Sequence, residues 1–315
     1  MTTSPQSHSH TPPRQAPGHP TRTALVLGGG GSTGNAWLIG VVAGLFDAGL
    51  DITHADVTVG TSAGSTAAAQ LASSSPTALF AEILAAASAT RPAFESATAG
   101  TRPVDDHLER MRRIVAASAG IADMRREMGA AALEREAKAD GSWQARWRAT
   151  VSSRLPGAGW PHRRILITAI DAESGEPVVF DRESGVDIVD AVAASCSSGL
   201  PYTIGDTKFL DGGYRSNADN ADLAAGYARV LVLAPFGGRS LAPADWRTDL
   251  ATQIDSLRAA GSRVETVFPR PDDEGLFGAN AMNPTLRAPA ARAGYERGRA
   301  GVERLRDLWR GRAER

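Results

Sequence analysis

The first candidate for chemistry in this sequence is Ser62, which stands between two glycines in the stretch GTSAG, residues 60–64. The pattern G-x-S-x-G is typical of a strand-to-helix turn so tight that only glycines fit beside the serine, here Gly60 and Gly64. This copy lies where the apolar run DVTVG meets the small-residue run SAGSTAAAQLA. We therefore predict that Ser62 is a nucleophile, with its hydroxyl presented at the N-terminus of a helix.

A serine hydroxyl is a weak nucleophile and needs a base. In the α/β-hydrolase arrangement the base is a histidine that follows the acid in the chain. That order fails here, because His162 is the last histidine and none follows a late aspartate. His54 and His107 stay open as bases, although single histidines near helix ends are more often structural.

A second candidate base is Asp211, at the end of the apolar run TKFLD. Gly212 and Gly213 follow it, and their lack of side chains would let the backbone bend and leave the carboxylate at the edge of a sheet. The alternative is that the Asp-Gly pair only makes a hairpin turn. Because no histidine stands in an interpretable position, Asp211 is the surviving candidate for the base, and on this fragment alone the hairpin interpretation stays equally open.

Four consecutive glycines, residues 28–31, follow the apolar run TALVL. The pattern G-x-G-x-x-G, typical of dinucleotide binding, is satisfied by Gly29, Gly31 and Gly34. This interpretation also requires an acidic residue at the end of the second strand to bind the ribose, but that strand ends in GTS. A phosphate-binding P-loop also fails, because Asn35 and Ala36 stand where a lysine and a hydroxyl residue are required. A nucleotide-binding α/β protein remains an alternative function.

These candidates must be held by a sheet with helices around it. Apolar runs predict strands in TALVLG, DVTVG, RRILITAID, PVVFD, TKFLDGG and RVLVLAP. Helical spacing follows the first two runs, from Gly34 to Ala48 and over SAGSTAAAQLA. This alternation predicts an α/β fold with a mainly parallel sheet. Residues from about 76 to 160 are helical in pattern, which predicts a helical insertion, and an amphipathic helix is expected from about residue 284 onward.

Composition limits the class of protein. The net charge of −1 offers no basic stripe for nucleic acid, and the single cysteine, Cys196, excludes an intrachain disulfide and a thiolate metal cluster. Residues 1–22 are rich in Pro, Ser and His and lack the apolar core of a signal peptide, so we expect a disordered tail before one domain over residues 23–312. The longest nearly apolar stretch, residues 36–46, is too short to span a membrane. We expect a cytoplasmic protein, at most bound to a membrane surface.

Three blocks, in this order, resemble the patatin-like phospholipase family. Residues 29–34 resemble its G-G-G-x-R/K-G motif, residues 60–64 its G-x-S-x-G motif, and residues 211–213 its D-G-G/A motif. The run DAVAASCSSGLP is similar to the family's small-residue helix ahead of the catalytic aspartate, and the resemblance extends from about residue 23 to 235. There are two departures. Thr33 occupies the position of the family's Arg or Lys, and Ser197-Ser198-Gly199 stands where the family tends to have an apolar residue and proline.

The resemblance implies a three-layer α/β sandwich and a serine-aspartate dyad, Ser62 and Asp211, that hydrolyses lipid acyl esters without a cofactor or a metal. An oxyanion hole would use backbone N–H groups, for which hydrogen-bond donors at a helix N-terminus are suited. By resemblance the candidates for this hole are Gly29, Gly30, Gly31, Ser32 and Ala63. The structural glycines are Gly34, Gly60, Gly64, Gly212 and Gly213. A catalytically silent, lipid-binding scaffold is the alternative, and neither the ester class nor the oligomeric state is specified.

Two further features have more than one interpretation. Cys196 is expected to be a small buried residue and not a nucleophile, since no histidine accompanies it. Trp143, Trp147, Val151 and Leu155 recur every four residues and form one stripe of a helix. The stripe would either pack on the protein's own core or place its tryptophans at a bilayer interface, with neighbouring arginines meeting phosphate groups.

Overall fold

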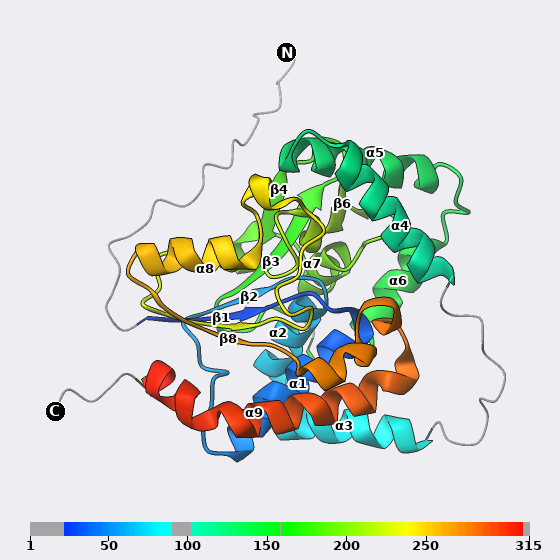
Figure 1. The fold of residues 1–315 in the computed structure, drawn as a ribbon. Coiled ribbons are helices and arrows are strands. Elements are labelled where there is room, and N and C mark those ends of the chain that lie inside the picture. Colours follow the sequence, from blue (N-terminus) through cyan, green and yellow to red (C-terminus); the bar gives the residue numbers. More distant parts are fainter. Residues whose placement is uncertain (1–21, 90–101, 158, 311–315) are drawn as a thin grey trace, which may run out of the picture.

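Residues 22–89, 102–157 and 159–310 are described by the computed structural model, and within them the apolar runs form an eight-stranded mixed sheet (Figure 1). The strand order is β5-β6-β3-β2-β1-β7-β8, and β4 pairs with β3 outside this path. The five strands from β3 to β8 along this path are parallel, whereas β4, β5 and β6 run antiparallel to their neighbours. The strands are β1 Thr23–Leu27, β2 Val57–Gly60, β3 Ile165–Asp171, β4 Pro177–Phe180, β5 Tyr202–Ile204, β6 Thr207–Asp211, β7 Arg229–Leu233 and β8 Arg263–Val267.

Helices cover both faces of the sheet. The helices are α1 Gly31–Asp47, α2 Ala63–Ser73, α3 Pro76–Ala89, α4 Arg102–Ala117, α5 Ile121–Glu136, α6 Trp143–Ser152, α7 Ile188–Ser195, α8 Leu250–Ala259 and α9 Arg287–Arg310. Alternate residues of a strand point to opposite faces. Accordingly, Leu25 and Leu27 belong to the core cluster with α1, α2 and α7, while Ala24 and Val26 belong to the cluster with α8. The predicted three-layer α/β sandwich is confirmed.

The predicted insertion contains helices only, within the part of it that the structure describes. These are α3, α4, α5 and α6, all between α2 and β3. Met124 and Met128 of α5 pack with Ile170 and Leu210, so the insertion adds cover to the sheet at β3 and β6 (Figure 1). The predicted tail, residues 1–22, lies outside the described residues except for Arg22.

The long helices α1 and α9 pack closely against each other through glycines (Figure 1). A Cβ added at Gly40 would lie 2.1 Å from the carbonyl oxygen of Ala291, and one at Gly294 would lie 2.2 Å from that of Trp37. Larger residues would force the helices apart. The C-terminal amphipathic pattern is thus the α9 face that covers α1. Within the described ranges, every helix is too short or too polar to span a bilayer.

The pairing of β3 explains how two distant motifs meet. Ile167 of β3 pairs with Gly60 of β2, and Ala169 pairs with Asp211 of β6, while β4 pairs with both of these β3 residues. Because β4 occupies one edge of β3, β2 and β6 must lie along the other edge. They run in opposite directions, so their carboxyl ends point toward each other on either side of Thr168. The elements after β2 and after β6 are therefore neighbours.

Candidate active site

Ser62 occupies a sharp turn between β2 and α2. Its φ is 51° and its ψ is −115°, a conformation that residues other than glycine rarely adopt. The flanking glycines are required by space, since a Cβ at Gly64 would lie 1.9 Å from the carbonyl oxygen of Leu27 and one at Gly60 would lie 2.7 Å from the Cα of Ser65. The turn is therefore a strained strand-to-helix junction of the kind that presents a reactive side chain.

Asp211, at the end of β6, accepts a hydrogen bond of 2.8 Å at Oδ2 from the Ser62 hydroxyl. Its other oxygen, Oδ1, accepts the N–H of Gly213, also at 2.8 Å. The side chain is buried, and burial raises the pKa of Asp211 to about 6, while the hydrogen bonds from Gly213 and Ser62 oppose that rise. Such a carboxylate is mostly ionised at neutral pH and is a stronger base than an ordinary aspartate.

The C-terminal end of α7 contacts both of these residues through Ser195, which sequence reasoning missed, and through Ser197, which it had noted only as a departure from the family pattern. The hydroxyl of Ser195 accepts the Ser62 N–H at 3.0 Å, and the carbonyl oxygen of Ser197 accepts the Asp211 N–H at 3.0 Å. Both serines lie in the small-residue run DAVAASCSSGLP. The side chains of this run are small because α7 lies close to the two turns. Its serine hydroxyl and carbonyl groups bind the backbone N–H groups of the candidate dyad.

The glycine segment passes beside the serine. A Cβ at Gly29 would lie 3.7 Å from the Cβ of Ser62. Among the described residues, no acceptor contacts the backbone N–H of Gly30, Gly31, Ser32 or Ala63. These N–H groups lie at the starts of α1 and α2, where helices leave their first donors unpaired.

One predicted donor needs correction. The N–H of Gly29 donates to the carbonyl oxygen of Ala218 at 2.7 Å, so it is already used and does not belong with the unpaired donors. The helix also begins earlier than expected, at Gly31 and not at Gly34. Gly31 has a φ of 64°. The N–H of Thr33, two residues further on, donates to the carbonyl oxygen of Ala281.

A cation reaches the glycine segment from a distant part of the chain. The guanidinium of Arg287, in the first turn of α9, donates to the carbonyl oxygen of Ser32 at 2.7 Å, to the Ser32 hydroxyl at 3.1 Å and to Oδ1 of Asn35 at 3.2 Å. Burial lowers the pKa of Arg287, and nearby Arg154 adds to this effect. Thr33 supplies no charge to this segment, but Arg287 fastens its first helical turn. No local motif in the sequence indicates this contact.

The histidines that stayed open as bases lie elsewhere. His107 is 3.3 Å from the hydroxyl of Tyr214, and burial, followed by Arg110 and Arg135, lowers its pKa to about 4. His54 lies beside Asp51 at 3.4 Å. Within the ranges that the structure describes, no histidine is hydrogen-bonded to the serine or aspartate of the candidate dyad.

Cys196 lies at the end of α7, beside the hydroxyls of Ser65 at 3.6 Å and Thr66 at 3.7 Å. Burial raises the pKa of this thiol to about 11, and the charge of Asp211 contributes further. A thiol with such a pKa stays protonated at neutral pH and is a poor nucleophile.

The tryptophan stripe of α6 faces the protein core. Val151 is buried, and the half-buried Trp143, Trp147 and Leu155 pack against the main core cluster. The indole N–H of Trp147 donates to the carbonyl oxygen of Ala193 in α7 at 3.0 Å. The structure thus favours core packing for this stripe over a bilayer interface.

A cavity of about 230 Å³ lies near the carboxyl ends of β7 and β8 and is lined in part by Pro235, Phe268 and Phe277. Pro235 also lies against the glycine segment, since a Cβ at Gly30 would lie 2.7 Å from the Cβ of this proline. Neither member of the serine-aspartate pair lines it. In the described part of the chain, no three His, Cys, Asp or Glu side chains are grouped as metal ligands.

A family model supports the resemblance that the motifs suggested. A family model described as "Patatin-like phospholipase" matches residues 25–224, well over half of the chain. Among solved structures, VipD from Legionella pneumophila is similar with 12% identity and a TM-score of 0.41, over 92% of this chain and 68% of that one. The type III effector protein ExoU shares 17% identity with a TM-score of 0.38, over 90% of this chain and 53%, about half, of its own. No curated protein matches the sequence.

Proposed function

This chain belongs to the patatin-like phospholipase family, and from that premise we propose that it hydrolyses carboxylic ester bonds of lipids with Ser62 as nucleophile and Asp211 as general base. Family membership supports a lipid hydrolase as the class of activity. One observation carries the assignment of residues: the hydroxyl of Ser62, in a strained turn, donates to Oδ2 of the buried Asp211 at 2.8 Å.

The first half of the reaction forms an acyl-enzyme. Oγ of Ser62 attacks the ester carbonyl carbon while Asp211 Oδ2 accepts the hydroxyl proton. The carbonyl electron pair moves onto oxygen and gives a tetrahedral oxyanion. When this intermediate collapses, the carbonyl re-forms, the bond to the leaving alcohol breaks and protonated Asp211 donates its proton to the alcohol oxygen. The fatty acyl group is then esterified to Ser62.

The second half releases the acid. A water molecule gives a proton to Asp211 and adds to the acyl carbon, the second tetrahedral intermediate collapses, and the proton returns from Asp211 to Ser62 Oγ. The N–H of Gly213 holds Asp211 Oδ1 during both halves, so that Oδ2 remains the atom that faces the serine. The same carboxyl group therefore acts as base and as acid without a histidine.

The oxyanion needs donors that are already in place. The unpaired N–H groups of Gly30, Gly31, Ser32 and Ala63 supply them in this proposal, and they lie at helix starts where the backbone dipoles favour negative charge. Removing one such donor typically costs about a hundred- to a thousandfold in rate. Three of these groups belong to the turn that Arg287 fastens.

The proposal is tested by hydrolysis of soluble esters, lysophospholipid, phospholipid and glyceride by the purified wild type, Ser62→Ala and Asp211→Asn. We expect both variants to lose at least about a thousandfold in kcat while keeping the melting temperature of the wild type within a few degrees. His107→Ala is the control and should stay within about tenfold of the wild type. A folded Ser62→Ala protein with more than a hundredth of wild-type activity would exclude Ser62 as the nucleophile.

The same assays separate the alternatives. A catalytically silent scaffold would bind lipid vesicles without releasing fatty acid from any of the four substrates. A nucleotide-binding protein would gain thermal stability with added nucleotide, since a ligand that binds only the native state raises the free energy of unfolding.

A further inference from the structure

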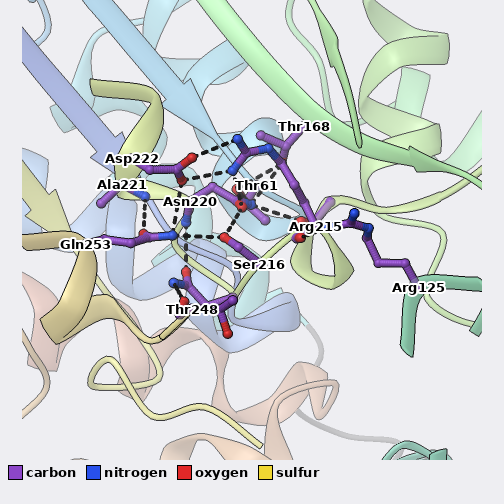
Figure 2. A network of polar contacts seen from close by, with 12 residues as sticks. Thr61, Arg125, Thr168, Arg215, Ser216, Asn220, Ala221, Asp222, Thr248 and Gln253 are labelled. Atoms are coloured by element: carbon purple, nitrogen blue, oxygen red, sulfur yellow. Dashed lines mark hydrogen bonds and ion pairs between the residues drawn. The ribbon is translucent and has the colours of Figure 1, made fainter. Parts of the chain in front are cut away.

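Asn220 lies between the turn that carries Ser62 and the turn that carries Asp211. Its side-chain N–H groups donate to the hydroxyl oxygen of Thr61 at 3.0 Å and to the carbonyl oxygen of Gly212 at 2.9 Å. Thr61 directly precedes the serine, and Gly212 directly follows the aspartate. One amide group thus joins the two turns. Figure 2 shows Asn220 and Thr61 from close by, within the polar network around them.

The position of this amide is fixed from the other side as well. Its Oδ1 accepts a guanidinium N–H of Arg215 at 3.1 Å and the hydroxyl of Ser216 at 2.9 Å (Figure 2). The residue is 0% exposed, so water cannot replace any of these partners without entering the core. A buried amide with both of its ends occupied has a single favourable orientation, which makes it a rigid connection.

The residue type also suits the backbone. Asn220 has a φ of 53° and a ψ of 42°, a left-handed conformation that asparagine tolerates better than most other residues with a side chain. Its own N–H donates to Oδ1 of Asn217 at 2.8 Å, which holds the loop in that shape. Glycine would adopt the same backbone shape but would provide no amide to join the turns.

We propose that Asn220 is a positioning residue that keeps Ser62 Oγ and Asp211 Oδ2 within hydrogen-bond distance. The inference rests on the proposed dyad, because it assigns a role in aligning those two groups. Asn220 itself touches neither of them; it acts on the residues next to them, Thr61 and Gly212. In the sheet the two turns meet at Thr168, whose hydroxyl donates to that of Thr61 at 2.9 Å, so the amide completes a connection that begins in β3.

The test compares Asn220→Gly and Asn220→Asp with Gln253→Ala as a matched control. Glycine keeps the left-handed backbone and removes the amide, and aspartate keeps the size and the Oδ1 contacts but replaces the bridging donor with an oxygen. Gln253 holds the same loop through the N–H of Ala221 at 2.8 Å and the hydroxyl of Ser216 at 2.9 Å, without contact to Thr61 or Gly212. The readouts are kcat and KM on a soluble ester, the melting temperature and the crystal structure of each variant.

We expect kcat to fall by about ten- to a hundredfold in both Asn220 variants with KM changed less than threefold, because misplacement by about 1 Å can cost a hundredfold in rate. We also expect the Oγ–Oδ2 distance to exceed hydrogen-bond range in these variants and to be kept in Gln253→Ala, even where melting temperatures fall equally. A retained 2.8 Å bond in Asn220→Gly, or a kcat within twofold of wild type in either folded variant, would overturn the inference.

The two proposals fail in different ways. The proposed function is refuted if the wild type shows no ester hydrolysis that is lost in Ser62→Ala. In that case the crystal structures still decide the positioning claim, since the distance between the two side chains is measured without substrate. If instead the wild type is active and Gln253→Ala loses as much kcat as Asn220→Gly, the effect belongs to the loop as a whole and the assignment to the amide is wrong.

Discussion

Lowering the pH below about 6 should switch off ester hydrolysis, because Asp211 would then be protonated and unable to act as base. Burial raises the pKa of this carboxyl to about 6, from an ordinary value near 3.9. At pH 5 only about a tenth of the molecules would carry the carboxylate, whereas an ordinary aspartate would be about nine-tenths ionised. We therefore expect kcat/KM to fall about tenfold per pH unit below the inflection.

The assay is the initial rate on a soluble ester between about pH 4.5 and pH 8 at constant ionic strength, since kcat/KM reports ionisations of the free enzyme and substrate. Samples returned to pH 7.5 must regain full activity, which separates titration from unfolding. Two control variants identify the titrating group. Asp219 carries a second buried carboxyl group. His107→Ala and Asp219→Asn should both keep the inflection near pH 6, because no hydrogen bond joins either side chain to the dyad in the described part of the chain.

An inflection near pH 4 would show that Asp211 is not perturbed as its burial requires. An inflection near pH 6 that disappears in His107→Ala would show that a histidine is the base. Loss of the inflection in Asp219→Asn would assign the titration to the other buried carboxyl. The first result refutes the effect assigned to burial, and the other two refute the reasoning from the 2.8 Å contact to a serine-aspartate dyad.

Three other predictions address the surroundings of the site. Burial raises the pKa of Asp219 to about 7, so the folded state binds its proton more tightly, and the contribution of this group to the free energy of unfolding is lost as the pH rises from about 4 to 7. Asp219→Asn should remove this pH-dependent contribution and stabilise the protein at pH 8 by up to about 4 kcal/mol in urea unfolding. Equal pH dependence in both proteins would contradict this. Arg287→Met should lower kcat on a soluble ester about tenfold, since the first turn of α1 loses its guanidinium contacts, and an unchanged kcat would show that the turn holds itself. Trp143→Ala with Trp147→Ala should lower the melting temperature by several degrees and reduce vesicle and soluble-ester hydrolysis equally; selective loss on vesicles would restore the bilayer interpretation.

The nucleophile turn was predictable because its requirements are local. Gly60 and Gly64 flank Ser62 in the chain, and their absence of side chains is what the close approach of β1 and α2 demands. Asp211 followed by two glycines is a weaker signal of the same kind, because the same three residues would also fit an Asp-Gly hairpin turn. Its pairing with the serine became clear only from the sheet, where β2 and β6 meet end to end along β3.

The contacts that support the site were not predictable in the same way. Arg287 is separated from Ser32 by 255 residues, and Asn220 from Thr61 by 159, so no spacing in the sequence connects them. The start of α1 was also misplaced, because glycines are poor helix formers and the run of four suggested a loop. Tertiary contacts override that preference, as the bond from the Thr33 N–H to Ala281 illustrates.

Two strands escaped prediction for a simpler reason. β5 has only three residues, and β8, RVETV, lies at the edge of the sheet with only two apolar residues, Val264 and Val267, among charged or polar ones. Short edge strands bury too little apolar surface to produce a clear run. The central parallel strands, in contrast, are buried on both faces and therefore appear in the sequence as nearly continuous apolar stretches.

The most direct test of the account is covalent labelling of the purified protein with a fluorophosphonate probe at pH 7.5, followed by mass spectrometry of its peptides. The account predicts one labelled residue, Ser62, with labelling abolished in Ser62→Ala and slowed at least about a hundredfold in Asp211→Asn, while Cys196→Ala labels at the wild-type rate. Labelling at a different residue, or equal labelling rates in wild type and Asp211→Asn, would contradict a nucleophile activated by this aspartate.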